Sequence, residues 1–256
     1  MDFIYKHEQV FNSQPISGTT YKIKEGIKTI GESVFDVSSV FGLPYDFRSF
    51  QFNLVMPESL EEIQKYAFYN CQKMEDINFG AKSNLRFIGP KAFYMTGLTQ
   101  IDLRNTKLLK LEVGTFLFCR KLESVLLPDT LQEIRGEVFY ECVRLTRIEI
   151  PNSVHSIGFE AFKGCQKLSR ISLPNSLTSL IHGIFDGCTS LEKITVPESV
   201  TVIEAHAFKN CSSLVSVTIP PSVQKIHIKA FAKCFKLDNA TTERLRLHFV
   251  NQNKKN

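Results

Sequence analysis

The side chains best suited to chemistry in this sequence are seven cysteines, distributed through a chain of 256 residues. Cys165 shows the question they raise, because Lys163 and Lys167 lie close to it and a nearby cation favours the reactive thiolate. Such a thiolate could attack a substrate or bind a metal ion. Either role requires one thiol to differ from the others through a neighbouring base, through exposure or through converging ligands.

The cysteines do not differ in this way, because they recur. From Cys119 onward a cysteine follows every 23 residues, and each lies three residues after a phenylalanine. In stacked coils such cysteines would lie ~5 Å apart, and a free cysteine packs as a small buried hydrophobe. We therefore interpret the series as a structural ladder; it comprises Cys119, Cys142, Cys165, Cys188, Cys211 and Cys234, with Phe139, Phe162, Phe185 and Phe208.

No other pattern predicts catalysis. Four histidines occupy different positions of the repeat and so do not form one column: His155, His182, His206 and His227. The sequence has no phosphate-binding glycine loop, no H-E-x-x-H motif and no C-x-x-C pair. It therefore predicts no catalytic residue, no metal site and no cofactor, and an enzyme with a spatially assembled site is the remote alternative.

The elements that must position these residues form a repeat, L-x-x-I-x-I-P-x-S-V-x-x-I-x-x-x-A-F-x-x-C-x-x. In one copy Ile148 and Ile150 alternate with a polar residue, which predicts a strand that Pro151 ends. The spacing from Val154 to Phe162 predicts a short helical or 3-10 return. One such unit cannot bury its apolar side, so the units must stack into a solenoid.

The unit, with its A-F-x-x-C and I-P-x-S-V segments, resembles the BspA-like (treponemal-type) leucine-rich repeats. The resemblance covers about nine units, residues 21–238, with an insert at about 37–50. It implies a leucine-rich-repeat solenoid of right-handed parallel β/α or β/3-10 coils. It also implies kinship with surface proteins of bacteria and protist parasites that serve in adhesion and host contact.

The chain ends do not match the repeat, and a solenoid must cover its first and last coils. We expect an N-terminal cap at 1–20 and a C-terminal cap at 239–256, with a helix favoured over a strand at 241–250 and disorder in the final NQNKKN. The insert holds several aromatic residues, including Phe41 and Tyr45. Two interpretations are open: it folds over the N-terminal coil, or it is a contact loop for a partner.

Charge and hydropathy restrict the partners. The net charge of +5 is modest and its cations are spread along the chain, which argues against nucleic acid as a partner. The sequence contains no run of 18 apolar residues, so it predicts no transmembrane helix. The first eleven residues lack the apolar core of a signal peptide, which favours the cytoplasm, whereas the resemblance implies the cell surface or secretion.

The outward face of the predicted strands remains as a binding surface. Arg147, Arg170 and Lys193 share one column of it, and the adjacent column holds Leu126 and Glu149. Two interpretations are open. Either three acids in flanking columns, Glu123, Glu149 and Glu192, neutralise these cations, or the cations meet an acidic partner. The sequence thus predicts a non-enzymatic module for protein–protein interaction or adhesion; a cytosolic scaffold or regulatory repeat protein is the alternative.

Overall fold

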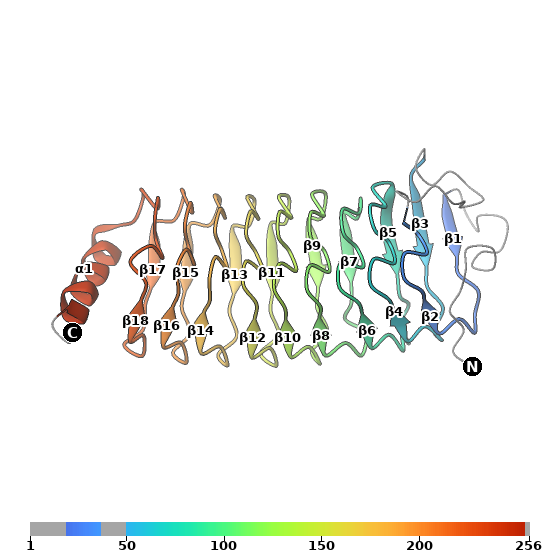
Figure 1. Ribbon diagram of the computed structural model, residues 1–256, viewed down its shortest axis with the longest axis horizontal. Coiled ribbons are helices and arrows are strands. Elements are labelled where there is room, and N and C mark those ends of the chain that lie inside the picture. The colour runs from blue at the N-terminus through green and yellow to red at the C-terminus, as the bar shows by residue number, and fades with distance from the viewer. Residues whose placement is uncertain (1–18, 37–49, 254–256) are drawn as a thin grey trace.

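The computed structural model describes residues 19–36 and 50–253, with side chains described as far as residue 250. These residues form one elongated solenoid in which each coil contributes a longer and a shorter strand (Figure 1). The nine longer strands are β1 (Thr20–Lys22), β3 (Phe52–Val55), β5 (Met74–Asn78), β7 (Gln100–Asp102), β9 (Ser124–Leu126), β11 (Arg147–Glu149), β13 (Arg170–Ser172), β15 (Lys193–Thr195) and β17 (Ser216–Thr218). The nine shorter strands are β2 (Thr29–Ile30), β4 (Glu62–Ile63), β6 (Phe87–Ile88), β8 (Lys110–Leu111), β10 (Glu133–Ile134), β12 (Ser156–Ile157), β14 (Ser179–Leu180), β16 (Val202–Ile203) and β18 (Lys225–Ile226).

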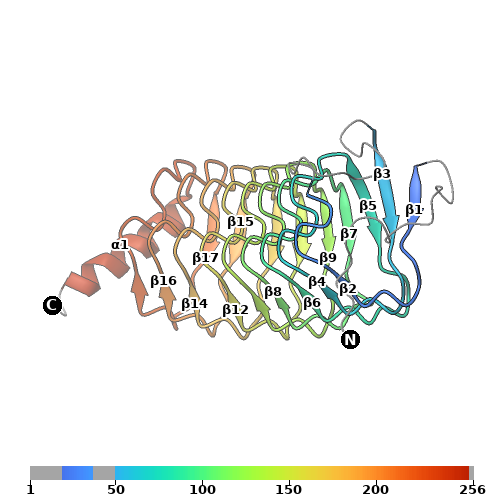
Figure 2. The same ribbon diagram turned by 45° about the vertical axis from the view of Figure 1, so that its right-hand side comes forward.

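Both rows of strands are parallel and keep the register of the repeat. Ile148 of β11 lies opposite Ile171 of β13, and Arg147 lies opposite Arg170. The longer strands form three hydrogen-bonded groups, β1-β3-β5, β7-β9-β11-β13 and β15-β17. Successive coils nevertheless remain side by side along the whole solenoid (Figure 2). Each repeat position therefore becomes a column on the surface or in the core.

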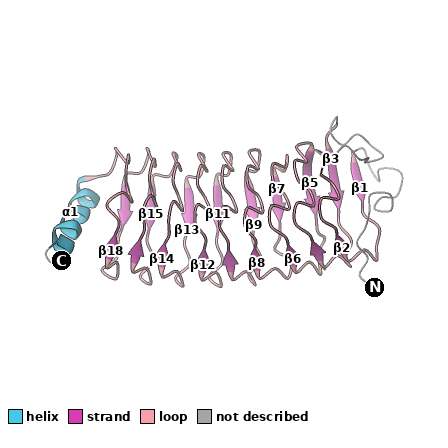
Figure 3. Cartoon of the chain, viewed as in Figure 1, coloured by secondary structure: helices cyan, strands magenta, loops and turns pink. Residues whose placement is uncertain are grey.

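The return segment differs from its prediction. The expected helical or 3-10 turn over residues 154–162 is wrong, because the short strand β12 and a run of turns occupy this region (Figure 3). Val154, Ile157 and Phe162 are all buried, as the pattern required. However, Glu160 has a left-handed backbone with φ of 52°, which a right-handed helix cannot accommodate.

The core consists of columns of identical side chains. Rings of the phenylalanine series stack from Phe35 to Phe231, with centroids 5.4 Å apart for the pair Phe139 and Phe162. Each cysteine thiol of the ladder donates a hydrogen bond to the carbonyl of a phenylalanine in the preceding coil. The Cys165 thiol, for example, lies 3.1 Å from the Phe139 oxygen. Packing and hydrogen bonding thus account together for a cysteine at this position.

The C-terminal end of the solenoid carries the only helix in the described residues, α1 (Asn239–Asn253). Asp238 caps this helix by accepting a hydrogen bond of 2.7 Å from the Thr241 amide. The Thr241 hydroxyl accepts a bond of 3.2 Å from the amide of Val217 in the last coil, and Leu245 is buried against the core. The helix therefore covers part of the terminal coil, and of the two alternatives the strand is excluded.

Several sequence predictions concern the chain ends and the insert. The helix includes residues 251–253 of the segment expected to be disordered, whereas residues 254–256 lie outside the described structure. Most of the predicted N-terminal cap and nearly all of the insert, including Phe41 and Tyr45, also lie outside it. Phe52 shares the aromatic cluster of the insert in sequence, yet it belongs to β3 and is buried.

Candidate binding surface

The outward face of the longer strands presents the predicted side chains to solvent. The parallel ladder places Arg147 directly between Ser124 of β9 and Arg170 of β13, and Lys193 follows on the neighbouring strand β15. All three cationic side chains are exposed. Because neighbouring strands lie roughly 5 Å apart, the three charges span about 10 Å along the solenoid. We call this set, Arg147, Arg170 and Lys193, the basic stripe.

No acidic side chain forms an ion pair with the basic stripe in the described residues. Glu123 was one of the acids expected to relieve the stripe, but its carboxylate lies 2.7 Å from the Arg144 guanidinium. Glu149 is exposed in the column beside the stripe, and no ion pair of the described residues includes it. The stripe is therefore a row of like charges that are exposed to solvent and form no ion pair within the described residues.

Two aspartates lie on the same face nearer the N-terminus. Asp76 of β5 occupies the column of the stripe, and Asp102 of β7 occupies the adjacent column. The Arg104 guanidinium binds both carboxylate oxygens of Asp102, at 3.0 and 2.7 Å, and these hydrogen bonds lower the pKa of that carboxyl. Asp102 is therefore neutralised by Arg104, and exposed Leu126 lies between these aspartates and the basic stripe.

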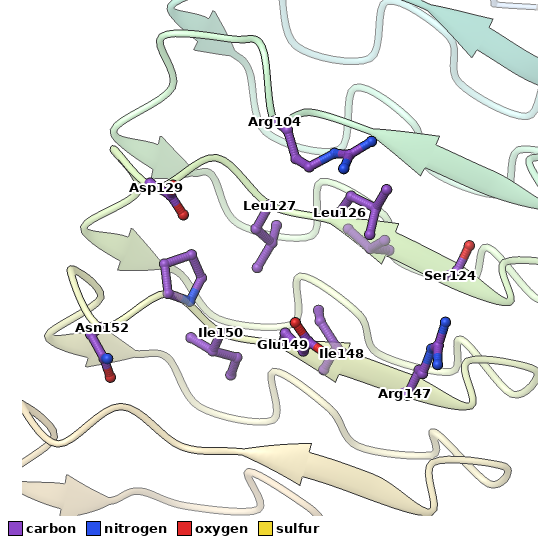
Figure 4. Close-up of a pocket in the computed structure, with 12 residues that line it drawn as sticks. Arg104, Ser124, Leu126, Leu127, Asp129, Arg147, Ile148, Glu149, Ile150 and Asn152 are labelled. Atoms are coloured by element: carbon purple, nitrogen blue, oxygen red, sulfur yellow. The ribbon is translucent and has the colours of Figure 1, made fainter.

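Shallow grooves follow this face from coil to coil. One groove of about 640 Å³ lies over β9 and β11 and includes Leu126, Arg147 and Glu149. Figure 4 shows Ser124 and Arg147 at one end of this groove and Asp129 and Asn152 at the other. A second groove of about 690 Å³ is lined by Arg170 and Lys193, among other residues. The predicted partner-binding residues that the structure describes therefore line two neighbouring grooves.

Sequence reasoning missed Arg104, which also lines the first groove and holds Asp102. The sequence did contain a sign of this ion pair, because Arg104 follows Asp102 by two residues just after a strand. The repeat pattern did not draw attention to it because the residue lies outside the strand columns.

The buried cysteines of the ladder lack the properties of a reactive site. Every cysteine is unpaired, and all except the half-buried Cys234 are buried. Burial raises the pKa of the Cys119 thiol to about 11 and that of the Cys165 thiol well above its ordinary value. Thiols of this kind stay protonated at neutral pH and are weak nucleophiles. Lys163, which suggested activation in the sequence, instead pairs with Glu160 at 2.8 Å.

The histidines form one contact that their repeat positions did not predict. The rings of His182 and His206 meet edge to face at 5.2 Å, although the two residues occupy different positions of the unit. Within the described part of the chain, no three histidine, cysteine or acidic side chains converge as metal ligands. No helix in that same part is long and apolar enough to span a bilayer.

The repeat columns, the parallel strands and the core ladder agree with a known family model. The model of the BspA type leucine-rich repeat region matches in six copies, over residues 45–147 and 132–252. The chain belongs to the BspA-type leucine-rich repeat family. Proteins of this family are typically interaction modules without catalytic activity.

Solved structures of bacterial leucine-rich repeat proteins share this fold. A leucine-rich repeat protein of T. pallidum is 21% identical, with a TM-score of 0.60 and 94% of each chain covered. The pneumococcal vaccine antigen PcpA is 17% identical, with a TM-score of 0.61, and the match covers 93% of this chain and 75% of the antigen. No curated protein matches the chain by sequence. At these identities, the likeness establishes the fold of this repeat protein and not its partner.

Proposed function

We propose that this BspA-type repeat protein is a non-enzymatic binding module whose basic stripe, with Leu126 and Glu149, engages an acidic segment of a protein partner. The observation that carries the proposal is the absence of ion pairs at Arg147, Arg170 and Lys193 among the described residues. Solenoids use such extended faces for binding, because each coil adds one position to the surface.

Electrostatics support an acidic partner. Two unit charges ~5 Å apart in water repel by roughly 1 kcal/mol, and the stripe contains two such neighbouring pairs. A partner carboxylate placed between two of these cations relieves the repulsion and adds attraction. Exposed charges of this kind mainly accelerate association and select the partner. Binding should therefore weaken as salt rises above physiological ionic strength.

We propose adhesion or host contact at a cell surface as the setting of this binding, on analogy with the family. A cytosolic scaffold is the alternative, and the same surface would serve it. The two settings are separated by comparing binding of the labelled protein to intact cells or extracellular matrix with binding to partners in a cell lysate. Retention on cells or matrix that depends on the basic stripe supports adhesion.

The direct test replaces the basic stripe by glutamate in one triple variant, Arg147→Glu, Arg170→Glu and Lys193→Glu. A control variant changes three exposed lysines elsewhere, Lys167→Glu, Lys229→Glu and Lys236→Glu. Both variants therefore have the same net charge. The probe is fluorescein-labelled poly-L-glutamate, followed by fluorescence anisotropy at low and physiological salt.

We expect the stripe variant to bind the probe at least ~10-fold more weakly than the control. Circular dichroism verifies that both variants keep the wild-type fold. Equal binding by the two variants would mean that the probe responds to net charge alone, and the stripe would then have no special role.

A further inference from the structure

One coil of the solenoid lacks a turn that its neighbours have. After the cysteine, the other coils in which the structure describes this segment place two residues in a turn before the next apolar residue, as in Cys119-Arg120-Lys121-Leu122. In the coil of Phe93 the corresponding segment is Thr96-Gly97-Leu98, one residue shorter and without that turn. The Gly97 amide instead donates a 3.0 Å hydrogen bond to the Cys71 carbonyl of the preceding coil.

The missing turn opens a notch between the coils on either side. The notch has a volume of about 580 Å³, and it is lined by Gly97, by Lys73 of the preceding coil and by Lys121 of the following coil, among other residues. Gly97 is pressed against the preceding coil, since an added Cβ would lie 2.8 Å from the Gln72 carbonyl carbon. We call this site the turn notch. It lies outside the longer-strand face, and none of its lining residues belongs to the basic stripe.

Large apolar side chains line the turn notch at a strained backbone position. Met95 and Phe118 have φ of 55° and 61°, in the left-handed region. Four other coils place glycine or asparagine at this position, which tolerate that conformation: Asn70, Gly164, Gly187 and Asn210. Among the described coils, only the two beside the notch carry large apolar side chains there. The left-handed turn itself belongs to the repeat, since Glu141 and Lys233 adopt it at the same position, and what distinguishes the notch is its pair of large apolar side chains.

The aromatic rings of the notch already contact one another. Tyr94 stacks on Tyr69 at 4.7 Å with an interplanar angle of 3°, and its ring meets Phe118 edge to face at 5.7 Å. The Arg120 guanidinium lies over Phe118, 5.6 Å from the ring centroid. Single-stranded nucleic acids need open ring faces on which bases can stack. The notch is instead lined by Met95 and by the rings of Tyr94 and Phe118, which are already engaged in these contacts, and this lining suits an apolar side chain.

The charged residues of the notch indicate which residues would flank that apolar side chain in a bound peptide. Its lining includes Lys73, Arg120 and Lys121 but no acidic residue. Within the described structure, Lys73 and Lys121 form no ion pair, and the acid nearest Arg120 is Glu141 at 3.9 Å. Because Lys73 and Lys121 belong to coils two apart, their backbones are about 10 Å apart. In an extended peptide, residues three apart are separated by roughly the same distance.

We infer that the turn notch binds a short acidic peptide segment of a protein partner, with one aromatic or aliphatic side chain inserted between Met95 and Phe118. Carboxylates flanking that anchor would pair with Lys73 and Lys121. The site is independent of the basic stripe, so it adds a second contact with its own specificity for an apolar anchor.

The test uses short fluorescein-labelled peptides and the protein of 256 residues. One peptide has a central phenylalanine with two glutamates on each side; a second has serine in place of phenylalanine, and a third has lysines in place of the glutamates. The protein variants are Lys73→Glu with Lys121→Glu, and Met95→Asn. The matched control, Lys167→Glu with Lys236→Glu, changes the same repeat position in two other coils.

We expect only the first peptide to bind saturably, and the notch reversal should abolish its binding while the control reversal does not. Met95→Asn should weaken binding about tenfold while keeping or raising the melting temperature, because asparagine suits the left-handed backbone. This opposite response of binding and stability would not arise from a purely structural residue.

The following results would overturn the inference. The first is no saturable binding of the phenylalanine peptide up to roughly 1 mM, and the second is equal binding of the serine peptide. The third is displacement of the peptide by oligothymidylate that itself binds more tightly and depends on Lys73 and Lys121, which would indicate nucleic acid. The stripe variant must retain peptide binding; if only that variant lost it, the site would be the stripe and not the notch.

Discussion

Truncation of one ring in the phenylalanine column should destabilise the solenoid according to the position of the coil. Phe162 is fully buried and stacks on two neighbours, with centroids 5.4 Å from Phe139 and 5.6 Å from Phe185. Phe231 in the last coil is only partly buried and has one stacked neighbour, Phe208 at 5.0 Å. Phe162→Ala thus loses two ring contacts and leaves a closed cavity, whereas Phe231→Ala loses one contact beside solvent.

The magnitudes follow from burial and ring contacts. A buried Phe→Ala change costs about 3–5 kcal/mol, and each aromatic pair contributes roughly 0.5–1.5 kcal/mol of additional stability. We therefore expect Phe162→Ala to lower the free energy of unfolding by about 4–5 kcal/mol. For Phe231→Ala we expect about 2 kcal/mol, since less surface was removed from water on folding.

Guanidinium unfolding followed by far-ultraviolet circular dichroism measures both variants. Phe235→Ala is the control, because this side chain is 84% exposed and its removal should change stability by less than ~0.5 kcal/mol. The reasoning fails if Phe162→Ala costs less than ~2 kcal/mol, or no more than Phe231→Ala does. Either result would show that the column does not hold the coils together cooperatively.

Three further changes test other parts of the structure. Gly158→Ala should cost at least ~2 kcal/mol in the same unfolding assay, because the new Cβ would lie 2.7 Å from the Gly136 Cα of the preceding coil. Cys165 should react with a thiol reagent at pH 8 only as fast as the protein unfolds, since burial raises its pKa well above the ordinary value. Arg104→Ala should slightly lower the melting temperature at pH 7 but not near pH 2, because Asp102 has a lowered folded-state pKa and loses this stabilisation as pH falls through it.

Each of these changes has a control. At Gly26 an added Cβ would meet no atom within 4 Å. Gly26→Ala should therefore lower the free energy of unfolding less than Gly158→Ala does, despite the φ of +90° at Gly26. The half-buried Cys234 should react faster than Cys165, and equal rates would contradict the burial argument. For Asp102, a melting-temperature difference that persists unchanged at low pH would show that Arg104 acts through packing and not through the carboxylate.

The repeat was readable from sequence because each coil makes the same contacts as the next. The spacing of Phe139, Phe162 and Phe185 alone predicts a column, and the structure stacks these rings in order. The return segment was predicted wrongly because apolar residues three or four apart occur both in a helix and in a strand joined to tight turns. The left-handed backbone at Glu160, which decides between them, leaves no reliable signature in a glutamate.

The sequence likewise predicts the binding surface only in part. The positions of Arg147, Arg170 and Lys193 in one column follow from the repeat, since equal spacing with no insertion keeps the strands in register. Whether acids reach these cations does not follow from it. Glu123 was a plausible partner in sequence, yet its side chain pairs with Arg144 at 2.7 Å. Side-chain pairing depends on directions across neighbouring coils, which linear spacing does not contain.

The sequence by itself determined the family, the stacking of coils and the composition of each column, because a solenoid repeats one local set of contacts along its axis. The tertiary structure decided what happens where the repeat is broken. The single residue missing beside Gly97 appears in the sequence only as an irregular spacing, but between two regular coils it becomes the turn notch. The sequence favoured a helix at the C-terminal end, but the place of α1 against the last coil follows from contacts such as that between Thr241 and Val217. Such features depend on neighbouring coils that are close in space and distant in the chain.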